Sequence, residues 1–593
     1  MAQKQWAVIS AAREDLIDKL TASLNIHRTL SQLLVQRGVT SFPDARDFFR
    51  PSLDCLHDPF EMKDMDIAIK RIDHAIDANE KILVYGDYDV DGTTAVALVY
   101  SFLKEIYNNL DYYIPDRYRE GYGVSMEGID YAAANAVGLI IALDCGIKAG
   151  TQIDYAKSKG IDFIVVDHHR PDDELPNAEA ILDPKRADCT YPYKELSGCG
   201  LGFKLAQAYY QRHKMPFEKL EKFLDLVAAS IAADIVPITG ENRILAHFGL
   251  KRLNLNPRAG FESILFYNNV FRKNQCCDKS VFTREIGIND LMFMIGPRLN
   301  AAGRIENGKT AVDLLLCENM GTTHQLSQTI NSNNEERRSL DTNITEQALA
   351  MISGSIALQK AKATVLFNPN WSKGVIGIVA SRLMENYYRP TIILTENNGV
   401  ITGSARSIKD FDIYNAIDAC RNHLDHFGGH KYAAGLSLRP ENLQAFIDDF
   451  NAIAEKEIDE SMMTPLLEID AVLGLSEIDA RFYRILKQFA PFGPGNHNPV
   501  FLATNCIAKG LPRIVGNKHL KFFLSQPQWA GKDFPAIAFG QSNHLQMLLS
   551  GQPFDVAYQI EENEWNGKTS IQLNVKDLRA SKSMEEKLQI QAS

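Results

Sequence analysis

Short apolar runs alternate with stretches of helical periodicity between residues 68 and 180 of the chain. Three of these runs lie at residues 81–86, 137–143 and 161–166. Continuous apolar runs of this length are typical of strands that are buried on both faces of a parallel sheet, and the helical stretches fit the crossover connections that parallel strands need. The pattern therefore predicts an α/β domain with a parallel sheet.

Acidic residues follow each of these predicted strands. In chain order, the side chains after the three runs are Asp87, Asp89 and Asp91, then Asp144, then Asp167, His168 and His169. Because ligands of open α/β sheets bind at the carboxyl ends of the strands, we expect these side chains to converge on one place. Asp234 is a candidate fourth contribution after the apolar helical segment 223–231, although a turn at the end of a helix would also account for an acid there.

A multivalent cation is the first explanation for the acidic triplet. Carboxylates at alternate positions repel one another unless a metal ion neutralises them, and the alternative is an acidic loop solvated by water. An EF-hand is not predicted, because a strand-like run precedes Asp87 and Leu98 occupies the twelfth position, where the loop needs a Glu.

The types of side chain narrow the choice of metal and of chemistry. Carboxylates with one or two imidazoles and no thiolate favour Mn²⁺ or Mg²⁺ over structural zinc, and imidazole favours Mn²⁺. The acids are numerous enough for two ions about 3.5–4 Å apart, an arrangement that activates water and stabilises the leaving oxygen. The predicted chemistry is hydrolysis of a phosphodiester or a pyrophosphate.

The remaining segments differ in pattern. A polar stretch with few helix breakers predicts a connecting helix between two lobes, the runs 363–367, 391–394 and 433–438 return to α/β character, and short alternating runs near the C-terminus predict an OB-like β-barrel. The predicted segments are an N-terminal helical arm (1–50), a catalytic α/β domain (51–324), a connecting helix (325–360), a second α/β domain (361–455), the barrel (465–580) and a tail (581–593).

Composition indicates a folded protein of a reducing compartment. The nine cysteines form no C-x-x-C pair and Cys276-Cys277 are adjacent, so neither disulfides nor structural zinc are expected. The N-terminus lacks an apolar signal core and no run of about 18 apolar residues exists, so a cytoplasmic location without a membrane span is expected. The net charge of −11 argues against a nucleic-acid partner unless a local basic groove is present.

Several motifs offer groups that suit phosphates. Arg298 and Arg304 lie in a segment that Gly and Pro mark as a loop, and the planar donors of arginine match phosphate oxygens. Ser404-Ala405-Arg406-Ser407 combines hydroxyls, a guanidinium and backbone amides, while Gly428-Gly429 allows a ligand to approach the backbone beside His430.

Two other motif matches are rejected. Residues 303–310 fit the P-loop expression, but Pro297 and a polar loop separate them from the nearest apolar run at 291–295, whereas a P-loop follows a strand directly. A metal site at His423, His426 and His430 is not predicted, because Gly428-Gly429 would break a helix before the third histidine.

The barrel segment carries both ingredients of single-strand binding. Cationic side chains lie close to a pair of phenylalanines, namely Lys509, Arg513, Lys518 and Lys521 beside Phe522 and Phe523. OB-folds bind single strands by aromatic stacking along a cationic track. The alternative is that the phenylalanines fill the barrel core and the lysines only solubilise it.

As a set, these motifs resemble those of the DHH phosphoesterases. The family's four motifs are similar, in order and context, to Asp87-Tyr88-Asp89-Val90-Asp91-Gly92, Asp144, Asp167-His168-His169 and Asp234. Further segments resemble the signatures of the RecJ single-strand-specific DNA exonucleases, at residues 297–304, 374–380, 404–407 and 428–430. The resemblance implies a DHH catalytic domain, a bridging helix, a DHH-associated domain and an OB-fold.

The resemblance also implies roles for single residues. Metal ligands for two Mn²⁺ or Mg²⁺ ions would be Asp89, Asp91, Asp144, His168 and Asp234, with Asp87 either a ligand or a near neighbour. Asp87 would replace a histidine that DHH relatives carry where this chain has Tyr85. His169 would contact the scissile phosphate, or else orient His168. Catalytic residues would be His169, Asp87 and Arg298, and substrate contacts would be Arg298, Asn300, Arg304, Ser404, Arg406, Gly428, Gly429, His430, Lys518 and Lys521.

The function implied by this resemblance is 5′-to-3′ degradation of single-stranded DNA to mononucleotides in DNA repair and recombination. A monomer is expected, with single-strand-binding protein and a RecQ-type helicase as partners. One alternative is a DHH phosphoesterase for short oligonucleotides or cyclic dinucleotides, for which a C-terminal barrel is not needed. The other is a non-catalytic replication scaffold, which would be expected to lose ligands that this chain retains.

Overall fold

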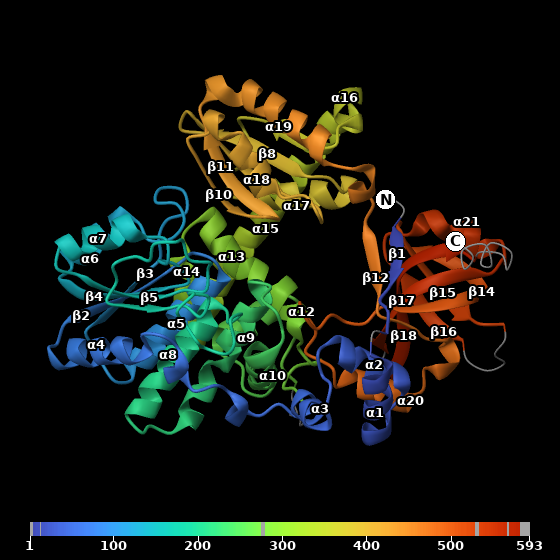
Figure 1. The fold of residues 1–593 in the computed structure, drawn as a ribbon, viewed down its shortest axis with the longest axis horizontal. Helices are drawn as coiled ribbons and strands as arrows, with labels where there is room; N and C mark the ends of the chain where they lie inside the picture. Colours follow the sequence, from blue (N-terminus) through green and yellow to red (C-terminus); the bar gives the residue numbers. More distant parts are fainter. Residues whose placement is uncertain (1–3, 12, 274–278, 528–532, 566–567, 582–593) are drawn as a thin grey trace. The chain divides into compact units, whose positions relative to one another are not determined.

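The computed structural model describes residues 4–11, 13–273, 279–527, 533–565 and 568–581. The chain forms two compact units (Figure 1). One comprises residues 51–463 with 493–495, and the other comprises residues 1–50, 464–492 and 496–593. No helix in the described ranges has both the length and the apolar character needed to cross a membrane.

The first sheet of the larger unit is parallel throughout, as the apolar runs predict. Its strand order is β3-β2-β4-β5-β6. The strands are β2 (Lys81–Gly86), β3 (Leu110–Tyr113), β4 (Val137–Leu143), β5 (Asp162–Val166) and β6 (Ala180–Leu182). The predicted runs coincide with β2, β4 and β5, whereas the short strands β3 and β6 were not predicted.

Helices cover both faces of this sheet, which explains why its strands are continuously apolar. Successive residues of β2, such as Ile82 and Leu83, belong to different hydrophobic clusters, one on each face of the sheet. Figure 1 shows α4 and α8 on one side of the strands and α6 and α7 on the other. The helices of this part are α4 (Met65–Asp77), α5 (Val90–Lys104), α6 (Met126–Ala134), α7 (Gly150–Ser158), α8 (Gly198–Arg212), α9 (Leu224–Ala233), α10 (Gly240–Leu255) and α11 (Ala259–Phe266).

The segment that carries Arg298 and Arg304 is a helix, so the predicted loop is wrong. Helix α13 (Gly296–Ile305) follows α12 (Ile288–Asp290) and the π-helical turn η4 (Leu291–Ile295). Pro297 directly follows the π-helical turn, and Ile295 and Gly296 at this junction both have helical backbone angles, so Gly296 and Pro297 lie within continuous helix and not in a loop. Residues 303–310 join α13 to α14 (Lys309–Leu316), so a helix and not a strand leads directly into them, and this confirms the rejection of a P-loop.

The connecting helix is longer at its start than predicted. Helix α15 (Met320–Ser353) has 34 residues, and a separate helix, α16 (Ile356–Lys360), completes the predicted range. Buried polar side chains line part of α15, among them Asp341, which forms an ion pair with Arg382 of α17 (Ile376–Tyr387) at 2.6 Å. The helix therefore contacts the second sheet region through charge as well as through apolar packing.

The second sheet is mixed, with strand order β10-β11-β9-β8-β7. Its strands are β7 (Thr364–Phe367), β8 (Thr391–Asn397), β9 (Val400–Arg406), β10 (His426–His430) and β11 (Ala433–Leu438), and α18 (Ile413–Ala419) and α19 (Leu443–Glu457) complete this part. The expectation that Gly428-Gly429 breaks a helix is wrong, because both glycines lie within β10. A Cβ on Gly429 would lie 2.3 Å from the carbonyl oxygen of Ala433, so glycine allows this tight pairing with β11.

The smaller unit contains the predicted barrel. Strands β14, β15, β16, β18 and β17 close a ring because β14 also pairs with β17, and β13 (Ala471–Val472) adds to β14. The ring strands are β14 (Phe501–Val515), β15 (His519–Ser525), β16 (Phe534–Ala538), β17 (Phe554–Trp565) and β18 (Lys568–Ala580), with α20 (Ala480–Lys487) and α21 (Leu545–Leu549) beside them. A closed five-stranded barrel of this size is typical of OB-folds.

The N-terminal residues belong to the same unit as the barrel. Strand β1 (Gln5–Val8), which was not predicted, pairs in parallel with β12 (Leu466–Ile469). Leu30, Leu33 and Leu34 of the N-terminal helices share a hydrophobic cluster with Phe501 and Phe554 of the barrel. These helices, α1 (Glu14–Leu24), α2 (Arg28–Gln36) and α3 (Phe42–Phe49), thus complete the barrel core.

The cysteines within the described ranges are all free, as the sequence predicts. Cys276-Cys277 and residues 582–593 of the predicted tail lie outside the described residues. The exact boundaries between the predicted segments stay predictions.

Candidate active site

The acidic triplet lies in a tight turn between β2 and α5. Asp87 follows β2 directly, and Asp89 caps α5, its carboxylate accepting a hydrogen bond from the backbone N–H of Gly92 at 3.1 Å. A Cβ on Gly92 would lie 2.4 Å from the backbone oxygen of Asp87, so the turn requires glycine there. The sequence D-x-D-x-D-G therefore folds into a strand-to-helix corner, with Asp91 in the first turn of the helix.

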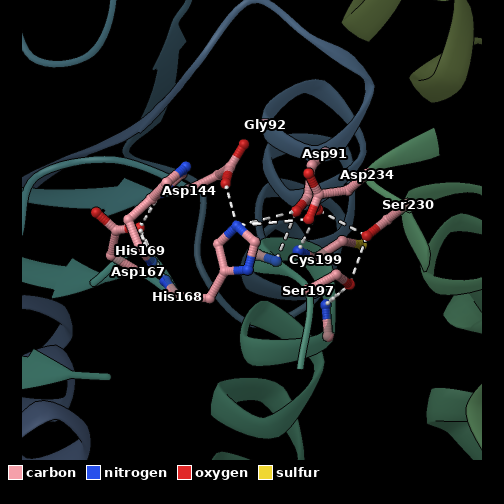
Figure 2. A network of polar contacts seen from close by, with 12 residues as sticks. Asp91, Gly92, Asp144, Asp167, His168, His169, Ser197, Cys199, Ser230 and Asp234 are labelled. Atoms are coloured by element: carbon pink, nitrogen blue, oxygen red, sulfur yellow. Dashed lines mark hydrogen bonds and ion pairs between the residues drawn. The ribbon is translucent and has the colours of Figure 1, made fainter. Parts of the chain in front are cut away.

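Carboxylates from this turn and from two other places meet around one imidazole, as the sequence predicts. Nε2 of His168 lies 3.2 Å from Asp144 Oδ1, 3.7 Å from Asp91 Oδ2 and 3.6 Å from Asp234 Oδ2. Figure 2 shows the ring between Asp144 on one side and Asp91 and Asp234 on the other. Asp234 is the C-cap of α9, so it is a helix-end acid that also reaches the cluster.

The cluster has the properties of a cation site. Asp87, Asp144 and His168 are buried, yet Asp87 Oδ2, Asp144 Oδ1 and both ring nitrogens of His168 make no hydrogen bond among the described residues. Burial, and then the neighbouring carboxylate of Asp91, raises the pKa of Asp144 and of Asp234, whereas burial lowers the pKa of His168. Unsatisfied oxygen and nitrogen atoms among buried acids fit a divalent metal ion, which would supply both bonding partner and charge.

His169 is held from both ring nitrogens. Its Nδ1 lies 2.7 Å from Asp167 Oδ1, and its Nε2 lies 3.1 Å from the hydroxyl of Tyr122. Burial would lower the pKa of His169, but the hydrogen bond and charge of Asp167 raise it to about 9. Burial would likewise raise the pKa of Asp167, but the hydrogen bond from His169 lowers it to about 2. The pair is therefore a positively charged imidazole on an ionised carboxylate.

A cleft of about 1080 Å³ connects this site with the second sheet. It is lined by Asp89 and His169 of the acidic site and, among the predicted substrate contacts, by Arg304, Ser404, Arg406, Gly428, Gly429 and His430. Arg117 also lines it, with its guanidinium 5.0 Å from the ring of Tyr88. Burial and the nearby charge of Arg117 lower the pKa of Arg304, to about 10, and that of Arg406. Cations that lie this close favour an anionic ligand between them.

Arg298 and Asn300 lie elsewhere on α13. Arg298 is buried and donates from Nε to Asn331 Oδ1 of α15 at 3.0 Å and from Nη1 to the carbonyl of Met294. Asn300 Oδ1 accepts a hydrogen bond from the backbone N–H of Val90 at 3.1 Å, at the start of α5. Neither residue is among those that line the cleft. Their placement favours support of the helices that carry the site.

In the barrel unit, each of the two alternatives for the phenylalanines holds for one of them. Phe522 on β15 is buried, whereas Phe523 is 52% exposed. Lys521 lies opposite Arg513 in the register of β15 and β14, and Lys518 is exposed in the preceding turn. One aromatic face and several cations therefore remain accessible on this surface.

Comparisons with known proteins agree with this architecture. Models of the DHH family, N-terminal domain, of the DHHA1 domain and of the RecJ OB domain match residues 81–231, 359–456 and 469–577. The single-stranded-DNA-specific exonuclease RecJ of Bacillus subtilis is 35% identical over 586 residues, which cover 98% of this chain and 72% of that protein. This chain belongs to the RecJ family.

Two further RecJ proteins extend the comparison. RecJ of Escherichia coli is 31% identical over 571 residues, which cover 93% of this chain and 95% of that protein. The crystal structure of RecJ in complex with Mn²⁺ from Thermus thermophilus superposes with a TM-score of 0.81 at 25% identity, covering 98% of this chain and 80% of that chain.

Sequence reasoning missed several residues of this RecJ-family site. Arg117 and Tyr122 lie in the loop after β3, a strand too short and too polar to be recognised from its pattern. Asp183 follows the unpredicted strand β6, and burial raises its pKa to about 7. An acid after a three-residue apolar run was the available signal, since the same pattern identified the other strand ends.

The paired charges of His169 and Asp167 predict how stability depends on pH in the metal-free protein. The raised pKa of His169 adds stability that is complete below its ordinary value of about 6.5 and is lost as the pH rises through about 9. The lowered pKa of Asp167 adds stability that is complete above about 3.8 and is lost as the pH falls through about 2. Asp167→Asn should therefore lower the thermal midpoint most between about pH 4 and 6.5.

The measurement is a series of thermal unfolding curves, taken with a chelator, across pH. Asp173→Asn changes an exposed acid of the same sheet region and is the matched control. A difference between wild type and Asp167→Asn that stays constant from pH 4 to beyond about pH 9 would contradict the pairing.

Proposed function

We propose that this chain is a metal-dependent exonuclease that degrades single-stranded DNA from the 5′ end to mononucleotides. The observation that carries the proposal is the convergence of Asp91, Asp144 and Asp234 on His168, with buried ligand atoms that lack hydrogen bonds among the described residues. Membership in the RecJ family supports the substrate class. The 5′-to-3′ polarity and the mononucleotide product rest on the resemblance of the motifs alone.

The residues that would hold Mn²⁺ or Mg²⁺ are Asp89, Asp91, Asp144, His168 and Asp234, with Asp87 beside them. The groups Asp91-His168-Asp234 and Asp144-His168-His169 each offer ligand atoms within 4.8 Å of one another, which supports a site for two ions. When bound, such ions lower the pKa of a water nucleophile and stabilise charge on phosphate oxygens. The Thermus relative was solved with Mn²⁺.

The protein's own groups would bind and orient the strand. Arg117, Arg304 and Arg406 place three cations along the cleft that Asp89 and His169 also line, which suits the phosphates of a strand whose scissile bond lies at the acids. The charged His169 imidazole, fixed by Asp167, would stabilise negative charge on the scissile phosphate through Nε2 once Tyr122 gives up that contact. The role of Asp167 would be to keep the imidazole oriented and protonated.

The barrel unit would hold the strand beyond the scissile bond. Phe523 offers an exposed ring for stacking, and Lys518 and Lys521 add charge for the backbone. The proposed setting is DNA repair and recombination in the cytoplasm, by a monomer that works with single-strand-binding protein and a RecQ-type helicase.

Digestion of a long single strand tests the activity and the polarity together. A strand labelled at one end or the other should lose the 5′ label first, as a mononucleotide, with Mn²⁺ or Mg²⁺ and not with a chelator. Asp144→Asn should reduce the rate by about 10²-fold or more, because even mutation of a residue that only hydrogen-bonds to a metal ligand lowers metal affinity or activity by about 10- to 100-fold. Asp154→Asn, an exposed acid on α7, is the matched control. Digestion that continues in the presence of the chelator would contradict the metal-dependent mechanism. Early loss of the 3′ label would contradict the 5′-to-3′ polarity.

Salt dependence tests the barrel surface. Replacing Lys518 and Lys521 by Ala should weaken binding of a long single strand and reduce the slope of log K against log salt by roughly 0.7 for each phosphate that is no longer neutralised. Lys19→Ala with Lys456→Ala removes the same charge from exposed helical positions and should leave the slope unchanged. An unaltered slope in the first variant would separate this surface from DNA binding.

A further inference from the structure

Asp91 differs from the other acids of the cluster because the protein holds both of its oxygens. Oδ1 accepts hydrogen bonds from the backbone N–H of Cys199 at 2.8 Å and from the hydroxyl of Ser230 at 2.6 Å. Oδ2 accepts one from the backbone N–H of Gly198 at 2.7 Å. Hydrogen bonds to an ionised acceptor are among the stronger ones, so Asp91 is fixed in one orientation (Figure 2).

The backbone donors come from the start of α8. Ser197 caps this helix, and its Oγ accepts a hydrogen bond from the N–H of Gly200 at 3.2 Å. A Cβ on Gly198 would lie 2.7 Å from the Cβ of Asp144, so the same helix start also packs against a second acid. The first turn of α8 therefore positions two carboxylates of the cluster at once, and its dipole favours their charge.

The hydroxyl of Ser230 is part of a short relay. Ser230 lies on α9, and its Oγ is 2.6 Å from the Oγ of Ser197; both side chains are fully buried. Each serine has a single hydroxyl proton. Because Ser230 uses its proton in the hydrogen bond to Asp91, it must accept the hydrogen bond from the hydroxyl of Ser197. Ser197 in turn accepts a hydrogen bond from the backbone N–H of Gly200. Every hydroxyl in this arrangement donates once and accepts once, and such chains strengthen their members.

We propose that Ser230, supported by Ser197, is a positioning residue that fixes Asp91 for metal binding. This inference rests on the proposed function, because the serine pair would orient a residue that is itself a proposed metal ligand. Ser230 acts only through Asp91, and it is not itself a ligand. Asp144 Oδ1 and both ring nitrogens of His168 have no hydrogen bond within the described structure and are available to an ion, whereas three hydrogen bonds fix the orientation of Asp91.

Binding of Mn²⁺ alone, measured by calorimetry on the full chain without DNA, tests the inference. Ser230→Ala should weaken Mn²⁺ binding by about 10- to 100-fold, the usual cost of removing a residue that orients a metal ligand. Ser230→Thr keeps the hydroxyl and should bind within a few-fold of wild type. Ser197→Ala removes the hydroxyl that donates a hydrogen bond to Ser230, and it should weaken Mn²⁺ binding by less than Ser230→Ala does.

Ser263→Ala is the matched control. Ser263 is a buried serine on α11 whose Oγ has no hydrogen bond within the described structure, so its loss should leave Mn²⁺ affinity unchanged. Exonuclease activity of Ser230→Ala should recover at high Mn²⁺, since the defect is in affinity; general damage to the fold would lower turnover at every Mn²⁺ concentration.

The outcomes separate the two proposals. If wild type binds no Mn²⁺, the proposed function fails. If wild type binds Mn²⁺ and both Ser230→Ala and Ser197→Ala bind it equally well, the positioning role fails and the proposed function stands. If Ser230→Ala does not fold, Ser197→Ala becomes the test of the inference. Unchanged Mn²⁺ affinity in that variant would then contradict the positioning role of the serine pair.

Discussion

Repulsion among buried carboxylates around His168 is the constraint on which the rest of the structure depends. Buried charges are costly unless they are paired, and here burial and neighbouring acids raise the pKa of Asp87, Asp144 and Asp234. The fold nevertheless brings these groups together, because β2, β4 and β5 end at one edge of the sheet and α9 ends at Asp234, within 3.6 Å of His168. Helix starts at α5 and α8 offset part of the cost, through the cap at Asp89 and the amides that bind Asp91. A divalent cation would offset the remainder.

The charges of the larger unit are arranged in two adjoining regions. The acids lie at the carboxyl edge of the first sheet, while Arg117, Arg304 and Arg406 line the cleft beside them. A polyanionic strand would be attracted by the arginines and brought to metal ions at the acids. This local arrangement explains why a net charge of −11 is a poor guide to the substrate. Net charge averages over the whole surface, whereas binding depends on the field within one cleft.

The sequence was informative where one residue type has few structural uses. Runs of buried aliphatic residues predicted β2, β4 and β5, and glycines beside acids marked the turn at Asp87 to Gly92. It was less informative where tertiary contacts decide. Strand β1 forms only by pairing with β12, far along the chain, and β10 is held by pairing with β11 despite two glycines. Pro297 predicts a loop by its usual role, yet it lies in continuous helix directly after a π-helical turn, where the local hydrogen-bond pattern is already altered. Tyr122 and Ser230 carry no motif, and only the three-dimensional structure shows that they contact His169 and Asp91.

The central claim is that the acids around His168 form a site for Mn²⁺ or Mg²⁺. Anomalous diffraction at the manganese absorption edge, from crystals of the full chain grown with Mn²⁺, tests it most directly. We expect manganese peaks in contact with the carboxylates of Asp91, Asp144 and Asp234 and with the imidazole of His168. Manganese bound only elsewhere, with none in contact with these side chains, would contradict the claim.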